Sequence, residues 1–209
     1  MKRLFLLPIA ILLFGAANAA GQDGLYAPVL PDDIAFVRVI NSDLNGGPVT
    51  VDLGTVRIGP IEYGAGSPYV PVRPGVYVVF SPTGRVPVTA ASGSFQTVIF
   101  SHGQSFVLED DHHDDPLRAQ LVVYNLLDTG VTVEAIQPAA PLFDDLRPGQ
   151  SASLALNAIP VTLRASATGG WTFDVSVELT RGDSFAVIAD SAHAEGGFVV
   201  KASVDNGSR

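Results

Sequence analysis

Residues 36–41 read FVRVIN, and residues 120–125 read QLVVYN, with the same closing asparagine. Further segments pair in the same order between the two halves of the chain: GGPVTVD (46–52) with GVTVE (130–134), Gly64 and Val76 with Gly149 and Val161, and GQSFV (103–107) with GDSFA (182–186). Self-similarity of this kind indicates two diverged copies of one structural unit. It also provides a control, because a motif that both copies share belongs to the architecture more often than to the chemistry.

Most segments between the turn signals alternate apolar and polar residues with a period of two. Residues 173–179 (FDVSVEL) are the clearest example, and Val37 and Val39 fall on one face as Leu121 and Val123 do. Such alternation is typical of strands with one buried face. The sequence therefore predicts an all-β protein of two tandem antiparallel β-sandwich domains, each of about seven short strands, after a cleaved signal peptide.

The predicted domain organisation follows from where the alternation starts and stops. It comprises a signal peptide (1–19), an extended N-terminal arm (20–33), a first β-sandwich (34–109), an acidic linker (110–116), a second β-sandwich (117–204) and a disordered tail (205–209). The linker is placed where the alternation ends and where Pro116 blocks a continuing central strand.

The first 19 residues have the layout of a secretory signal. Lys2 and Arg3 precede an apolar run from Leu4 to Phe14, and residues 17–19 (ANA) offer small side chains for cleavage after Ala19. The chain contains no cysteine, which excludes a cysteine-linked lipoprotein and a disulfide scaffold. We therefore expect a soluble protein of the Gram-negative periplasm.

The charge balance narrows the classes of partner. The chain carries 12 basic and 21 acidic residues, a formal charge of −9, and loss of Lys2 and Arg3 with the signal leaves −11. A field of this sign repels nucleic acid, anionic membrane surfaces and, at long range, a polyanionic sugar chain. Nucleic-acid binding is therefore excluded, and we expect no membrane insertion after signal cleavage, because no other stretch of about 18 apolar residues exists.

The region after the signal matches a known pattern. Residues 24–28 read GLYAP, Pro31 follows, FVRVIN comes at 36–41, and the second half opens with LVVYNL at 121–126. Together with the chain length and the two-domain layout, these residues resemble the family of the alginate biosynthesis protein AlgF, a periplasmic accessory of exopolysaccharide O-acetylation. The resemblance covers the organisation of the whole chain, and its specific residues are concentrated in 24–41.

The resemblance implies a non-enzymatic adaptor or polymer-handling subunit that needs no cofactor. The partners it implies are a membrane-bound O-acyltransferase, periplasmic acetyltransferase or hydrolase-like enzymes, and the polysaccharide itself, which is alginate or, as for related proteins, cellulose. The acidity of this chain favours a neutral polymer or a protein partner over a charge-driven alginate groove. The alternative interpretation is a free-standing carbohydrate-binding module with no role in acetylation.

Residues 110–115 read DDHHDD, the densest group of metal-ligand types in the chain. Imidazole and carboxylate groups are competent ligands for Zn²⁺, so Asp111, His112, His113 and Asp114 are weak candidates for a metal site. Neighbouring residues in a linker rarely converge in tetrahedral geometry. We therefore expect a solvated linker without a specific metal ion.

Two short segments have the residue types of a Ser-His-Asp esterase: GDS at 182–184, and Asp190 three residues before His193. The matched string GQS at 103–105 lacks the aspartate, and an intervening strand would separate the two segments by about 20 Å. His102 has no evident partner. We therefore expect no catalytic residue.

Aromatic side chains beside turns are candidates for stacking on sugars or for contacting a partner. These candidates are Tyr26, Tyr63, Tyr69 and Trp171. The competing interpretation is that Tyr63, Tyr69 and Trp171 cap the cores of the sandwiches. Tyr26 belongs to the predicted arm, which could pack on the first sandwich or offer a strand to a partner.

Overall fold

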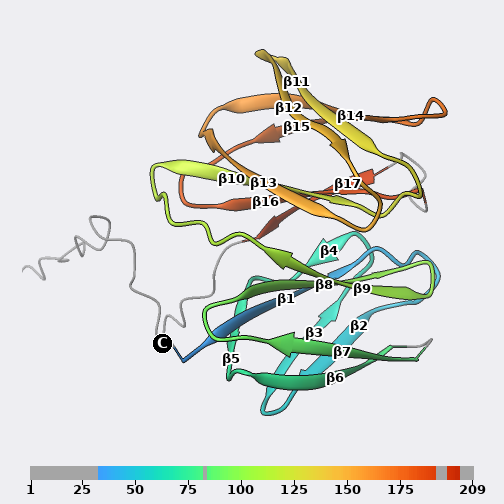
Figure 1. The fold of residues 1–209 in the computed structure, drawn as a ribbon, viewed down its shortest axis with the longest axis vertical. Coiled ribbons are helices and arrows are strands. Elements are labelled where there is room, and N and C mark those ends of the chain that lie inside the picture. Colours follow the sequence, from blue (N-terminus) through green and yellow to red (C-terminus); the bar gives the residue numbers. More distant parts are fainter. Residues whose placement is uncertain (1–32, 82–83, 192–196, 203–209) are drawn as a thin grey trace, which may run out of the picture.

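The computed structural model describes residues 33–81, 84–191 and 197–202. Every regular element within these residues is a β-strand, which confirms the all-β prediction (Figure 1). The predicted signal peptide, the arm up to residue 32 with Tyr26, His193 and the predicted tail lie outside the described residues. No helix in the described part of the chain is long and apolar enough to cross a membrane.

The first half of the chain forms an inner sheet and an outer layer. Its strands are β1 (Ala35–Asn41), β2 (Val49–Leu53), β3 (Val56–Ile61), β4 (Ala65–Gly66), β5 (Val70–Val72), β6 (Gly75–Ser81), β7 (Gly84–Ala90), β8 (Phe95–Ser101) and β9 (Gln104–Asp110). The inner sheet has the order β4-β1-β8-β9, with β5 also paired to β1. The antiparallel pairs β2–β3 and β6–β7 form the outer layer and share a core with the inner sheet.

The second half repeats this arrangement. Its strands are β10 (Arg118–Asn125), β11 (Val131–Gln137), β12 (Ala139–Leu146), β13 (Ser151–Asn157), β14 (Pro160–Ala167), β15 (Thr172–Glu178), β16 (Ser184–Ala189) and β17 (Gly197–Ala202). The inner sheet has the order β13-β10-β16-β17, and the outer sheet has the order β12-β11-β14-β15. The outer sheet is continuous here, whereas in the first half it is split between β2 and β6.

Each inner sheet contains one parallel pair, β1 with β8 and β10 with β16. The sequence predicts antiparallel sandwiches, and these two pairs depart from that prediction. Parallel neighbours cannot be joined by a tight turn and need a long crossover. In both halves the strands of the outer layer lie within the crossover, so the parallel pair and the second layer arise together.

Backbone hydrogen bonds identify equivalent positions in the two halves. The Gly64 N–H donates to the Asn41 carbonyl, and the Gly149 N–H donates to the Asn125 carbonyl, both at 2.8 Å. The sequence match between these glycines and between these asparagines is therefore also a structural match. β1 and β10 are the same strand of the repeated unit.

Gly182 corresponds in structure to Gly93 and not to Gly103. The Gly93 N–H donates to the Ile34 carbonyl and the Gly182 N–H donates to the Arg118 carbonyl, both at 2.8 Å, and each glycine leads into the strand parallel to the first strand of its half. The predicted match of GQSFV with GDSFA is therefore wrong. The similar strings open β9, at the end of its sheet, and β16, inside its sheet.

The asparagine that both copies share fixes the turn after the first strand of each half. Its side-chain oxygen accepts a hydrogen bond from a backbone N–H two residues later, that of Asp43 or Leu127. Its amide group donates to two carbonyls in each half: Gly47 and Ile61 at 2.9 and 3.0 Å from Asn41, and Thr129 and Leu146 at 2.7 and 2.8 Å from Asn125. Asparagine commonly stabilises turns by such side-chain hydrogen bonds to the backbone. The shared residue therefore has a structural role in both halves.

Each half has its own apolar core between its two layers. Val37 and Val39 lie in the core of the first half, and Leu121 and Val123 lie in the core of the second, as the repeat predicts. In β15 the alternation also predicts the faces correctly, because Phe173 is buried and its polar neighbours are exposed.

The first strand of each half is buried on both faces. Ile40 and Ile99 of the first half pack against Val122 and Ile188 of the second half, so the two inner sheets face each other. The four layers form one stack, visible from bottom to top in Figure 1. The alternation in FVRVIN predicts a solvent-facing Arg38, and this prediction is wrong because Arg38 is fully buried between the halves.

Candidate functional site

A buried polar cluster surrounds Arg38 where the two inner sheets meet. Its Nε donates to the Thr97 hydroxyl at 2.7 Å, and its Nη2 donates to the Tyr124 hydroxyl. The guanidinium carbon lies 4.5 Å from the centre of the Tyr69 ring and 5.5 Å from the centre of the Tyr124 ring. Arg38 is thus held by hydroxyls and aromatic faces from both halves of the chain.

Asp110 supplies the negative charge of this cluster. Its carboxylate accepts hydrogen bonds from the hydroxyl of Tyr69 at 2.7 Å and from those of Thr97 and Tyr124. The predicted solvated linker of residues 110–116 is therefore wrong at its first residue, because Asp110 ends β9 and is buried. Three hydroxyl donors therefore satisfy this buried carboxylate.

The protonation states in this cluster follow from burial. Burial raises the pKa of Tyr69 well above its usual 10.0, and burial also raises the pKa of Tyr124. Burial opposes the charge on Arg38, but electrostatic attraction to Tyr124, Tyr69 and Asp110 raises its pKa overall. Both tyrosines stay protonated as hydrogen-bond donors and the arginine stays charged, so the cluster joins the halves and offers no accessible reactive group.

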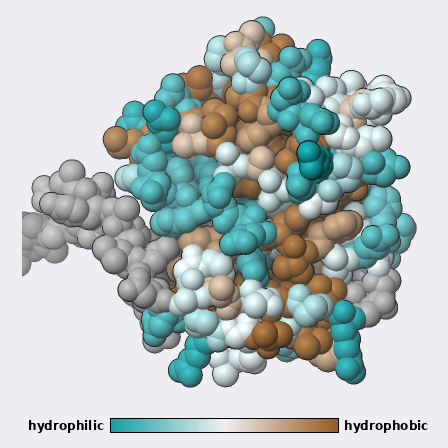
Figure 2. Space-filling view, viewed as in Figure 1, coloured by the Kyte–Doolittle hydropathy of each residue, from teal (hydrophilic) through white to brown (hydrophobic). Residues whose placement is uncertain are grey.

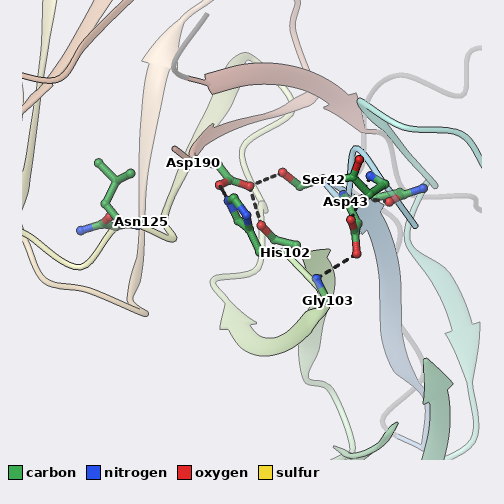
Figure 3. Close-up of polar contacts among 10 residues, drawn as sticks. Ser42, Asp43, His102, Gly103, Asn125 and Asp190 are labelled. Carbon is green, nitrogen blue, oxygen red and sulfur yellow. Dashed lines mark hydrogen bonds and ion pairs between the residues drawn. The ribbon is translucent and has the colours of Figure 1, made fainter. Parts of the chain in front are cut away.

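A second polar cluster centres on Asp190, a fully buried residue that follows β16. Its Oδ2 accepts hydrogen bonds from the Ser42 hydroxyl and, at 2.6 Å, from the Ser101 hydroxyl, and its Oδ1 lies 3.0 Å from Nε2 of His102. Figure 3 shows Ser42 and His102 converging on Asp190, while Asn125 lies apart. The three partners come from the ends of β1 and β8, so this cluster also bridges the halves.

The expectation that His102 has no partner is wrong. Its side chain is 51% exposed, and its partner Asp190 lies 88 residues away in the other half. The turn that carries it is held by Asp43, whose Oδ2 accepts a hydrogen bond from the Gly103 N–H at 2.9 Å. No local sequence pattern could have predicted the pairing, because it depends on how the two halves pack.

The residue types at Asp190 are those of a catalytic triad, but their connections differ. In a triad the histidine lies between the serine and the aspartate and takes the serine proton. Here Asp190 lies between the two, and both Ser42 and Ser101 donate to its carboxylate. Neither hydroxyl is hydrogen-bonded to the imidazole of His102, so the arrangement does not activate a nucleophile.

Ser184, the serine of the predicted esterase-like segment, is buried at the start of β16. It donates a hydrogen bond to Oε1 of Gln120 at 3.0 Å. Asp190 follows the opposite end of the same strand, as the spacing between the two segments predicts. The structure therefore does not bring Ser184 and Asp190 together.

The acidic segment after β9 contacts both halves. Oδ2 of Asp111 accepts a hydrogen bond from the Ser153 hydroxyl at 2.5 Å, and the ring of His112 stacks on Phe95 with 4.8 Å between centroids. A ring nitrogen of His113 lies 3.0 Å from the Arg118 carbonyl, and Asp114 is exposed. Among the described residues, no group of three or more histidine, aspartate or glutamate side chains is arranged to hold a metal ion.

The structure does not gather the candidate aromatic residues on one surface. Tyr69 is buried in the Arg38 cluster, and Trp171 is partly buried against the core of the second half. Tyr63 is partly exposed, and burial together with the negative charge of Asp190 raises its pKa. The interpretation of Tyr69 as a residue available to a sugar or partner is therefore wrong.

The outer face of β6 exposes three large apolar side chains that the sequence analysis did not single out. Val76, Val78 and Phe80 are 71%, 46% and 65% exposed, and we call them the apolar ridge. The intervening Val79 is fully buried, so the ridge is the outward face of a strand whose inward face already serves the core. Figure 2 shows hydrophobic side chains at the lower end of the molecule, where Figure 1 places β6 and β7.

The equivalent surface of the second half is polar. The outer faces of β11, β14 and β15 expose Glu134, Arg164 and Asp174, and Arg164 forms a two-pronged ion pair with Asp174 at 2.8 and 2.6 Å. Val76 and Val161, which the repeat matches, differ in burial: Val76 is exposed and Val161 is buried. The run of five apolar residues from Val76 to Phe80, unlike the alternation elsewhere, is the sequence signal that could have revealed the ridge.

Comparisons with known proteins identify the family. The family model described as "Alginate O-acetyl transferase AlgF" matches residues 9–186, and no curated protein matches. A solved structure titled "The Bacillus anthracis TIE protein" is similar at a TM-score of 0.27 and 9% identity, over 81% of this chain and 34% of the other, so the chain spans about a third of its length. The family match covers most of the chain, and the chain therefore belongs to the AlgF family.

Proposed function

We propose that this protein is a non-enzymatic adaptor of the periplasmic machinery for alginate O-acetylation. It holds a membrane-bound O-acyltransferase and a periplasmic hydrolase-like enzyme in a fixed arrangement near the polymer. The observation that carries the proposal is the apolar ridge, which is exposed although the core beneath it is complete. Exposed apolar side chains that lie next to one another mark interaction sites, whereas single apolar residues scattered over a surface are normal.

The connection between the two halves supports the same role. The inner sheets share an apolar contact between the Arg38 cluster on one side and the Asp190 cluster on the other. A surface on one half is therefore held at a fixed position relative to a surface on the other. An adaptor needs this property to place two partners, whereas two domains on a flexible linker lack it.

The hydrogen bonding of the polar clusters supports a role without catalysis. Ser42 and Ser101 donate to Asp190 and not to His102, and Ser184 donates to Gln120. A serine nucleophile needs a base within hydrogen-bond reach. We infer that acetyl groups are transferred by the partners and that this chain contributes their arrangement.

The test is co-purification combined with an activity assay. The tagged chain is co-expressed with the O-acyltransferase and the hydrolase-like enzyme, and each is expected to elute with it. The purified chain alone is expected to release no acetate from acetylated alginate or p-nitrophenyl acetate above the uncatalysed rate. Failure of both partners to co-elute, or acetate release that is lost in His102→Ala, would contradict the proposal.

The alternative, a free-standing carbohydrate-binding module, has less support. Tyr69 is buried and Trp171 is partly buried against a core, whereas a sugar-binding platform needs exposed aromatic rings. Binding of purified alginate or cellulose that Trp171→Ala weakens, without co-purification of either enzyme, would favour this alternative.

A further inference from the structure

The outer layer of the first half combines the apolar ridge with positive charge. Phe80 lies opposite Arg85 across the β6–β7 pair, and the guanidinium of Arg85 lies 5.2 Å from the centre of the Phe80 ring. Arg57 on β3 and Arg73 before β6 are also exposed. The acidic side chain on β2 is Asp52, 3.6 Å from Arg57.

We propose that the apolar ridge and its arginines are the docking surface for a protein partner whose own contact surface is apolar and rimmed by carboxylates. This inference rests on the proposed adaptor function and names the face that performs it. In a chain with a formal charge of −9, a face rich in arginine is complementary to acidic groups on the other protein. Arginine and exposed aromatic residues are also the types enriched at the centres of interfaces.

The partner docks on the face of the pair and does not extend it as an added strand. Pro87 lies in β7, directly opposite Val78. Proline has no backbone N–H to donate to an added strand, and it protects edges from strand addition. The side chains of the ridge therefore carry the recognition, with Pro87 and Thr89 extending the exposed surface beside it.

Other occupants fit this surface less well. Two copies related by a two-fold axis would bring Arg85 of each copy towards the same basic face, which is unfavourable. The outer sheet of the second half exposes Glu134, Arg164 and Asp174, and none of the large exposed apolar side chains of the described residues lies on its strands. A polysaccharide needs flat rings and hydrogen-bonding groups, whereas two of the three ridge residues are branched aliphatic side chains.

The experiment compares ridge variants with matched variants elsewhere. Val78→Ser and Phe80→Ser remove apolar surface from the ridge, and Leu154→Ser and Ile159→Ser remove exposed apolar surface from the second half. Arg85→Glu reverses a ridge charge, and Arg147→Glu reverses an exposed charge of the second half. Circular dichroism and thermal unfolding confirm that each variant is folded, which is expected because all six positions are solvent-exposed.

The probes are the co-expressed O-acyltransferase and hydrolase-like enzyme, each captured separately. We expect Val78→Ser and Phe80→Ser to lower recovery of one of the two enzymes by about tenfold or more, while the second-half variants keep it. Arg85→Glu is expected to lower recovery most at low salt, since salt screens exposed charges.

The outcomes separate this inference from the proposed function. If the unaltered chain captures neither enzyme, the adaptor function fails. If it captures an enzyme and the ridge variants capture as much, the adaptor function stands and the assignment of this face is overturned. A dimer in light scattering that Phe80→Ser dissociates, or alginate binding that it abolishes, would also overturn the assignment.

Discussion

At the scale of single residues, the contact between the halves depends on positions where the two copies differ. Arg38 of β1 occupies the place of Val122 in β10, and Tyr124 of β10 occupies the place of Ile40 in β1. The charged group therefore comes from one half and its hydroxyl partner from the other. Two identical copies would place like residues against each other, so divergence at these positions created the complementary pair.

The buried tyrosines predict how stability changes at high pH. The pKa of Tyr69 is raised in the folded protein above 10.0, its value in the unfolded chain. The unfolded state releases this proton first, so the contribution to stability is full below about pH 10 and is lost as the pH rises beyond it.

Absorbance at 295 nm during alkaline titration tests this expectation. The folded protein is expected to ionise only some of its five tyrosines before it unfolds, with the remainder ionising in step with the loss of circular dichroism. Ionisation of all five while the fold persists would show that the Arg38 cluster is open to solvent.

At the scale of strands, the sequence predicts the facing of some elements and not of others. The alternation in β15 correctly predicts which side chains are buried, because one face of that strand meets solvent. FVRVIN in β1 also alternates, but a second sheet covers the face that the pattern assigns to solvent. β6 is apolar on both faces, so its five-residue run could signal an exposed apolar surface but could not say which face meets solvent.

Sequence patterns likewise predict only those features of the candidate site that do not depend on packing between the halves. The repeat predicts the shared Asn41 and Asn125, and the length of one strand predicts the separation of Ser184 from Asp190, because both depend on order within one half. The contacts of Arg38 and His102 depend on how the halves pack, and neither composition nor spacing carries that information. The similar strings that open β9 and β16 led to a wrong match, because a short motif specifies a turn and not the place of the following strand in its sheet.

The cluster around Asp190 predicts different losses of stability when Asp190 and when His102 is replaced by alanine. Asp190→Ala leaves two buried serine hydroxyls without their acceptor, and we expect it to lower the free energy of unfolding by about 3 kcal/mol. His102→Ala removes a half-exposed partner and should cost less than about 1 kcal/mol. Urea denaturation of both variants provides the comparison, and equal losses would mean that the cluster is not organised around the carboxylate.

At the scale of the whole molecule, two similar units are combined into one body with two different outer faces. The first half exposes an apolar and basic outer layer, and the second half exposes a polar one. The repeat accounts for the two-layer fold of each half, and the residues that differ between the copies account for the two different outer faces. Partner recognition is expected where the copies differ, since a shared face would bind the same partner twice.

The continuous stack predicts that the halves unfold together. Calorimetry should show one cooperative transition, and Asp110→Ala should shift the whole transition downwards, because removal of one member of a buried charged cluster costs about 3–5 kcal/mol. Two resolved transitions, only one of which moves in Asp110→Ala, would show that the halves are independent domains.

The acetyl content of the alginate made by cells that carry single variants of this chain tests the adaptor account most directly. Phe80→Ser disrupts the docking surface, whereas His102→Ala changes the residue that most resembles a catalytic base. The account predicts that acetylation falls strongly in Phe80→Ser and stays near the unaltered level in His102→Ala, with both proteins folded and equally abundant. Loss of acetylation in His102→Ala together with full acetylation in Phe80→Ser would contradict it.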